Sequence, residues 1–219
     1  MYKYFIFFVL LSSASVFTAE ETQVLPTNEE ESFTYCINEN LKNDTSDWIT
    51  FPITFGFFDI ETGVDNAEKV TVSLPSEPKF IQANGMQSPH ITVTDQDGMS
   101  FNIARMEIPE DGFNLKQSVN FLAESISKSS SKKLIGWGWP EPNPNDSVYF
   151  MMWAEGDKMI RLTMVKSTHL VYFLETSICN EIYRNFDWES METDTVSFDT
   201  IMRDSLKTNT FTRSFVIEQ

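Results

Sequence analysis

Histidine, cysteine and glycine are scarce in this chain of 219 residues, which contains two histidines, two cysteines and eight glycines. The histidines, His90 and His169, each lie beside a predicted strand end or turn, outside any paired-histidine zinc motif. The glycines form neither a phosphate-binding loop nor the Gly-x-Ser-x-Gly turn of a nucleophilic serine. The sequence therefore predicts a protein that is not an enzyme and that holds no metal and no cofactor.

Carboxylates are abundant, and they leave one alternative open. The chain has 32 acidic residues, so a catalytic carboxylate pair cannot be picked out from the sequence. The alternative function is a secreted hydrolase with an unrecognised carboxylate or Ser/His site. A deep pocket that brings His90 or His169 beside a buried acid would favour this alternative.

Basic residues are half as numerous as acidic ones, 16 against 32, and the formal net charge is −16. A field of this sign repels phosphate backbones, so we expect no nucleic-acid partner. The same field disfavours an anionic membrane surface. Beyond the first residues, no stretch is long and apolar enough to cross a bilayer, which predicts no membrane span once that first segment is removed.

The first residues have the layout of a secretory signal. Lys3 precedes an unbroken apolar run, Tyr4 to Leu11, and small residues follow from Ser12 to Ser15. We expect a signal peptide over 1–19, with cleavage between 14 and 19, and a secreted or periplasmic location. The alternatives are an uncleaved anchor and an ordinary strand. The acidic segment 20–32 reads as a solvated lead-in, and 33–219 as a single globular domain.

The two cysteines, Cys36 and Cys179, could form one disulfide in an exported chain. A bridge that closes so long a loop would stabilise the fold by about 4–5 kcal/mol in the chain-entropy treatment. The alternative is two buried free thiols. Asn43 and Asn145 begin glycosylation sequons, whose use depends on the host.

Alternation with a period of two predicts most of the strands. It marks 48–58, 69–74, 90–94 and 159–165, and 100–106 follows as the partner strand of 90–94. The runs 148–154 and 170–174 are apolar strands, and the first is apolar on both faces, which predicts a central position. Pro52 lacks a backbone donor and places the first of these strands at a sheet edge. Asp97-Gly98 is a tight-turn signal between two of them. The segment 33–41 fits a short helix or a strand.

Two amphipathic helices separate and follow these strands. Leu115, Val119, Leu122 and Ile126 form one apolar stripe, and Asn114 can cap its start. A polar link is expected over 127–133, and a second helix over 197–206. Short links make neighbouring strands antiparallel. The predicted fold class is α+β, a central antiparallel sheet flanked by helices.

This layout resembles the PsbP-like fold, which is shared with the Mog-type Ran-binding proteins and many exported bacterial proteins. Three features carry the resemblance: the strand and proline-bounded turn from Val70 to Pro78, the helix from Leu115 between two strand groups, and the strand Val171 to Leu174 with a helix ending near Leu206. It covers about 69–206, while 179–194 and the part before 69 have no counterpart. It implies an α/β/α sandwich and a non-enzymatic binding or assembly role, and it supplies no catalytic residue.

Residues 134–144 have the most unusual local composition, with two tryptophans, two glycines and three prolines. Trp137 and Trp139 share a parity, so both rings would point the same way, and exposed rings would form a platform for a protein partner or a sugar ring. The commoner arrangement is that both rings pack beneath a neighbouring helix or loop. We therefore expect an exported, non-catalytic module that binds another envelope or extracellular protein, with Trp137 and Trp139 as its candidate contact residues.

Overall fold

The computed structural model describes residues 45–59, 63–83, 86–109, 112–140, 143, 146–185 and 195–218. The predicted signal 1–19, the acidic lead-in 20–32, the segment 33–41, Cys36 and both sequon asparagines, Asn43 and Asn145, lie outside the described residues. Within the described part, each helix is too short or too polar to span a bilayer.

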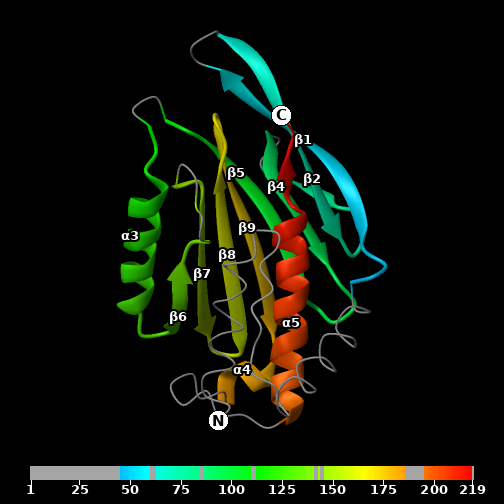
Figure 1. The fold of residues 1–219 in the computed structure, drawn as a ribbon, viewed down its shortest axis with the longest axis vertical. Coiled ribbons are helices and arrows are strands. Elements are labelled where there is room, and N and C mark those ends of the chain that lie inside the picture. The colour runs from blue at the N-terminus through cyan, green and yellow to red at the C-terminus, as the bar shows by residue number, and fades with distance from the viewer. Residues whose placement is uncertain are drawn as a thin grey trace, which may run out of the picture.

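The main element is a seven-stranded antiparallel sheet in the order β3-β4-β5-β9-β8-β7-β6 (Figure 1). Its strands, in chain order, are β3 (Lys79–Ala83), β4 (Met86–Thr94), β5 (Ser100–Glu107), β6 (Lys132–Gly138), β7 (Val148–Glu155), β8 (Lys158–Lys166) and β9 (Leu170–Cys179). Strand β9 pairs with both β5 and β8, so it joins the strands that precede the first helix to those that follow it.

Helix α3 (Leu115–Ser127) covers one face of this sheet beside β6 and β7. Its buried residues, Leu115, Val119, Ala123 and Ile126, repeat at helical spacing and pack with residues of β7 and β8. Asn114 begins the helix, because its side chain accepts a hydrogen bond from the Gln117 amide at 2.9 Å. This helix and its cap were predicted from the sequence and are confirmed.

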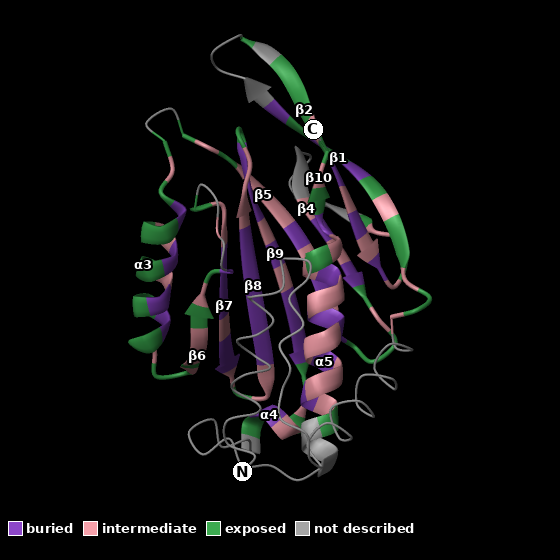
Figure 2. Ribbon diagram, in the orientation of Figure 1, coloured by how far each residue is buried: buried purple, intermediate pink, exposed green. Residues whose placement is uncertain are grey.

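The opposite face is covered by two different elements. One is a small sheet made of β1 (Ile49–Asp59), β2 (Val64–Leu74) and β10 (Val216–Ile217). The other is α5 (Thr195–Ser214), which runs along β9 in Figure 1 and follows the short helix α4 (Glu181–Asn185). The buried residues of β1 and β2 alternate along each strand as predicted. Figure 2 shows that buried positions also run along the central strands of the main sheet.

The predicted fold class, an α+β protein with an antiparallel sheet flanked by helices, is confirmed. The placement of β1 at an edge is also confirmed, since among the described strands it pairs with β2 alone. One layer differs from the expectation. Strands β1 and β2 do not belong to the main sheet but form the small sheet, which packs on the main sheet beside α5. The small sheet therefore supplies part of the cover that we expected helices alone to supply.

Two segments contradict the sequence predictions. The polar link expected over 127–133 runs into a strand, β6, that was not predicted from the sequence. Two glycines and a register shift between Leu134 and Gly136 interrupt the alternation by which a strand is recognised in a sequence. The second helix was predicted over 197–206 but extends from 195 to 214. Its later turns are rich in Thr and Asn, which have low helix propensity, so tertiary packing must stabilise them.

Replacing a buried side chain on β9 tests this architecture. We expect Leu174→Ala to lower the free energy of unfolding by about 2–5 kcal/mol, because Leu174 is fully buried and its loss leaves a cavity between the sheet and β1–β2. Ile49→Ala is the matched control, since Ile49 is 58% exposed and should change stability by less than about 0.5 kcal/mol. Urea unfolding measures both, and equal losses would contradict the layer arrangement.

Candidate functional site

Trp137 and Trp139 lie at the free edge of the main sheet. Trp137 is in β6 opposite Met151, a residue of the core beneath α3, so its ring is on the α3 side of the sheet. The two ring centroids are 6.2 Å apart, and the Trp139 ring is 5.8 Å from Tyr149, a neighbour in the same core. The rings are 38% and 37% exposed, so they form neither a fully buried pair nor a freely projecting one.

A lysine and a buried tyrosine hold this pair in place. The Lys116 ammonium lies 5.1 Å from the centre of the Trp139 ring, within the range of a cation–π contact. Tyr149 lies beneath and is 1% exposed, and its hydroxyl donates to Asp146 at 3.1 Å. Burial and this hydrogen bond raise the pKa of Tyr149, which keeps the phenol protonated as a donor. We call Trp137, Trp139 and Lys116 the tryptophan surface.

Gly138, between the two tryptophans, lies close to an aromatic ring of the neighbouring strand β7. A Cβ atom at this position would lie 3.2 Å from Cζ of Phe150, closer than most real contacts. The absent side chain lets the Phe150 ring pack against the β6 backbone on the α5 side of the sheet. The Phe150 ring and the two indoles thus lie on opposite sides of the sheet.

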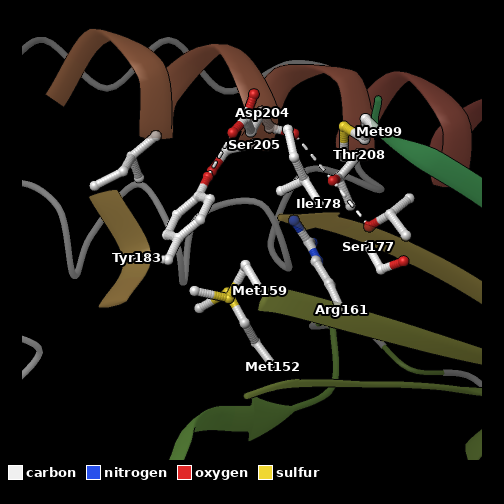
Figure 3. Close-up of a pocket in the computed structure, with 12 residues that line it drawn as sticks. Met99, Met152, Met159, Arg161, Ser177, Ile178, Tyr183, Asp204, Ser205 and Thr208 are labelled. Carbon is white, nitrogen blue, oxygen red and sulfur yellow. Dashed lines mark hydrogen bonds between the residues drawn. The ribbon is translucent and has the colours of Figure 1, made fainter. Parts of the chain in front are cut away.

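A second group of polar residues lies inside the molecule, between α5 and the sheet (Figure 3). It surrounds a cavity of about 30 Å³. The cavity is lined by Met99, Met152, Met159, Arg161, Thr176, Ser177, Ile178, Tyr183, Ile201, Asp204, Ser205 and Thr208. This volume accommodates one or two water molecules and is far smaller than a pocket for an organic substrate.

Asp204 on α5 is the acidic group of this cavity and is 4% exposed. The Tyr183 hydroxyl, from α4, donates to its Oδ2 atom at 2.6 Å, and Arg203 Nε lies 3.7 Å from its Oδ1 atom. Burial raises the pKa of Asp204, although the hydrogen bond and the nearby cations oppose this shift. Burial and the charge of Asp204 also raise the pKa of Tyr183, so the phenol acts as a donor and not as a base.

Arg161 on β8 extends toward the cavity beneath α5 (Figure 3). Its guanidinium donates to Asn209 at 2.9 Å and lies 5.9 Å from the centre of the Phe150 ring. Burial and the charge of Arg213 lower the pKa of Arg161 to about 10, so it still carries its charge at neutral pH. The side chain therefore joins α5 to β8 as a buried cation.

Lys207 on α5 makes the third polar connection, to the turn between β4 and β5. Its ammonium donates to Asp95 Oδ2 at 2.7 Å and to Asp97 Oδ2 at 2.5 Å. Burial lowers the pKa of Lys207, but its hydrogen bonds to Asp95 and Asp97 outweigh this effect and leave that pKa raised. The same bond holds the pKa of Asp97 below its usual value. The turn predicted at Asp97-Gly98 is thus fixed to α5.

The two histidines do not take part in either group. Neither His90 nor His169 lines the cavity, and the His169 ring stacks on Phe57 with centroids 4.9 Å apart. Among the described residues, no three His, Cys, Asp or Glu side chains converge as metal ligands. The cavity beneath α5 holds a buried acid, Asp204, but no histidine lines it.

Cys179 ends strand β9, is exposed, and has no disulfide partner among the described residues. Because Cys36 lies outside them, the bridge stays a prediction. Sequence reasoning missed Lys116, Tyr149, Arg161 and Asp204. Each belongs to its site through strand register or helix packing, and no motif in the sequence marks it.

Comparisons with known proteins found similar chains among the solved structures. No protein-family model matches the chain, and no curated protein matches it. Among solved structures, the solution structure of cyanobacterial PsbP (CyanoP) from Synechocystis sp. PCC 6803 is similar, at 12% identity and a TM-score of 0.43. The match covers 75% of this chain and 92% of that chain. Membership of the PsbP-like group stays a prediction.

Removing the Lys207 ammonium tests the connection between α5 and the β4–β5 turn. We expect Lys207→Met to lower the free energy of unfolding by about 3–5 kcal/mol at pH 7, because it leaves the buried Asp95 carboxylate without its cation. Lys128→Met is the control, since the Lys128–Glu124 pair is exposed and should be worth at most about 1 kcal/mol. Comparable losses in chemical denaturation would contradict a buried pair.

The pH dependence of Tyr183→Phe tests the bond to Asp204. The bond favours the ionised carboxylate, so its loss should cost about 1.5–3 kcal/mol at pH 7. Because the folded pKa of Asp204 is already raised and the variant raises it further, the cost should shrink as pH falls from 7 to an acid value below that raised pKa, where the carboxyl is protonated in both proteins. Unfolding at both pH values measures this, and Asp204→Asn should abolish the pH dependence. A cost independent of pH would contradict the assignment.

Proposed function

We propose that this chain is an exported, non-catalytic binding module that contacts another envelope or extracellular protein through the tryptophan surface. The observation that carries the proposal is the partial exposure of two adjacent indoles, Trp137 and Trp139, on the edge of the main sheet. Tryptophan is enriched among residues that dominate binding energy, because it offers a large apolar area at a low cost in conformational entropy. The signal layout of residues 1–19 supports export.

The interior supports a non-catalytic role. Asp204, Lys207 and Arg161 make hydrogen bonds that join α5 to neighbouring elements. The cavity beside two of them has a volume of about 30 Å³, which leaves no room for a substrate to approach the carboxylate. The charged groups therefore serve to position α5, and we assign binding to the surface.

The experiment compares partner capture by three proteins. Trp137→Ala with Trp139→Ala should reduce binding of a captured extracellular protein by about tenfold or more, because it removes both anchors. Phe121→Ala is the matched control, since Phe121 is 74% exposed on the outer side of α3 and its loss should leave binding unchanged. The captured protein is then purified, and its Kd for each variant is measured by calorimetry.

Thermal unfolding of the three proteins must be similar, so that loss of binding reports the surface and not the fold. Equal affinity of the double variant and the wild type would reject the tryptophan surface as the contact site. An equal loss in Phe121→Ala would show a general effect of exposed aromatic residues and would also reject it.

A further inference from the structure

We propose that the partner adds an extended, acidic segment to the β6 edge, as a further strand of the main sheet. This inference rests on the proposed function, because it specifies the chemistry of the partner that the tryptophan surface binds. It is carried by three observations on β6: its position in the strand order, the side chains that flank its backbone, and the charge of its surroundings.

Strand β6 is the last strand of the sheet, and its only strand neighbour among the described residues is β7. Alternate backbone amides and carbonyls of an edge strand point away from the sheet, and they can pair with an incoming strand. Recognition by strand addition uses these groups for affinity and the adjacent side chains for specificity. The edge therefore has the hydrogen-bonding groups that an extended peptide needs.

The two sides of β6 differ near its end. On the α3 side, Trp137 and Trp139 form a wall beside the strand. On the other side, Gly136 has no atom within 4 Å of the place where a Cβ would lie, so the backbone is open there. An added strand would pack alternate side chains against the indoles and pass the others across the glycine.

The charge around β6 is opposite to that of the whole protein. Residues 115–140 contain four lysines and one glutamate, a net charge of +3 in a chain of −16. Lys132 and Lys133 begin β6, and Lys116 lies against Trp139. Lys132 lies 3.8 Å from Glu155 on β7, and Lys128 pairs with Glu124, but both pairs are exposed and screened by solvent. With Glu155 included, four lysines face two glutamates, so the surroundings of β6 keep an excess of positive charge. An acidic segment matches this field, whereas the same edge of a second copy would bring its own lysines toward them.

The test selects ligands from a random library of linear peptides of about twelve residues displayed on phage, on the folded wild-type protein. Peptides with an excess of Asp and Glu should be enriched. Lys132→Gln with Lys133→Gln should weaken the selected peptides about tenfold at low salt, and less at high salt. The matched control is Lys69→Gln with Lys79→Gln, which removes the same charge from exposed positions on β2 and β3 and should have little effect.

Strand addition has its own signature. N-methylation of alternate backbone amides of the best peptide should abolish binding in one register and leave it intact in the other, because only every second amide faces β6. Hydrogen exchange of the complex should slow at the β6 amides and not at α5. Enriched peptides that lack acidic residues, or that tolerate methylation in both registers, would overturn the inference.

The remaining outcomes separate this inference from the proposed function. If no peptide is enriched, or if the protein binds glycans or its own copies through β6 instead, the acidic strand is rejected. The proposed function survives that result when the double tryptophan variant still loses its extracellular protein partner. If that variant keeps its partner, the proposed function fails whatever the peptides show.

Discussion

Strand β9 has apolar residues buried on both of its faces, and the rest of the fold depends on this constraint. Leu170, Tyr172 and Leu174 enter the core beneath β1, β2 and α5, whereas Val171 enters the core beneath α3. A strand with two buried faces must be covered by a layer on each side. The protein therefore needs α3 on one side and the combination of α5 with the small sheet on the other.

The layer made by α5 depends on polar contacts as well as apolar ones. Its buried side includes Ile201 and Phe211, but also Asp204, Lys207 and Thr208. Each of these polar residues bonds to a different element: Asp204 to α4, Lys207 to the β4–β5 turn, and Thr208 to Thr176 on β9 at 3.0 Å. Unpaired, such groups would oppose burial, so the contacts restrict α5 to one position on the sheet.

These features explain which parts of the fold could be predicted from the sequence. Alternation at Val70, Val72 and Leu74, and the stripe from Leu115 to Ile126, gave correct elements because apolar residues fill those buried positions. The second helix was predicted too short, and hydrophobic periodicity does not describe its buried side, because Leu206 is only half-buried while Asp204 is buried. Its polar partners come from distant segments, and hydrophobic periodicity cannot identify them.

For the candidate site, too, the sequence identified some features and not others. The unusual composition around Trp137 and Trp139 marked the residues, but the sequence offered no sign that β6 is a strand with a free edge. Two glycines, a register shift and a single strand neighbour make that strand locally weak. The contact of Trp139 with Tyr149 and Lys116 also arises only from register and from the start of α3.

The rigidity of the tryptophan surface distinguishes it from an ordinary exposed aromatic residue. Phe121 projects from α3 largely into solvent, as single apolar side chains often do on soluble proteins. Trp139, in contrast, packs on the buried Tyr149 and beneath the Lys116 ammonium, and Trp137 packs on Trp139. Side chains that are already ordered lose little conformational entropy when a partner binds. Under the proposed function, a partner would therefore gain most of the apolar contact energy of the two indoles, which is the physical reason for proposing the edge of the sheet, and not the interior, as the contact site.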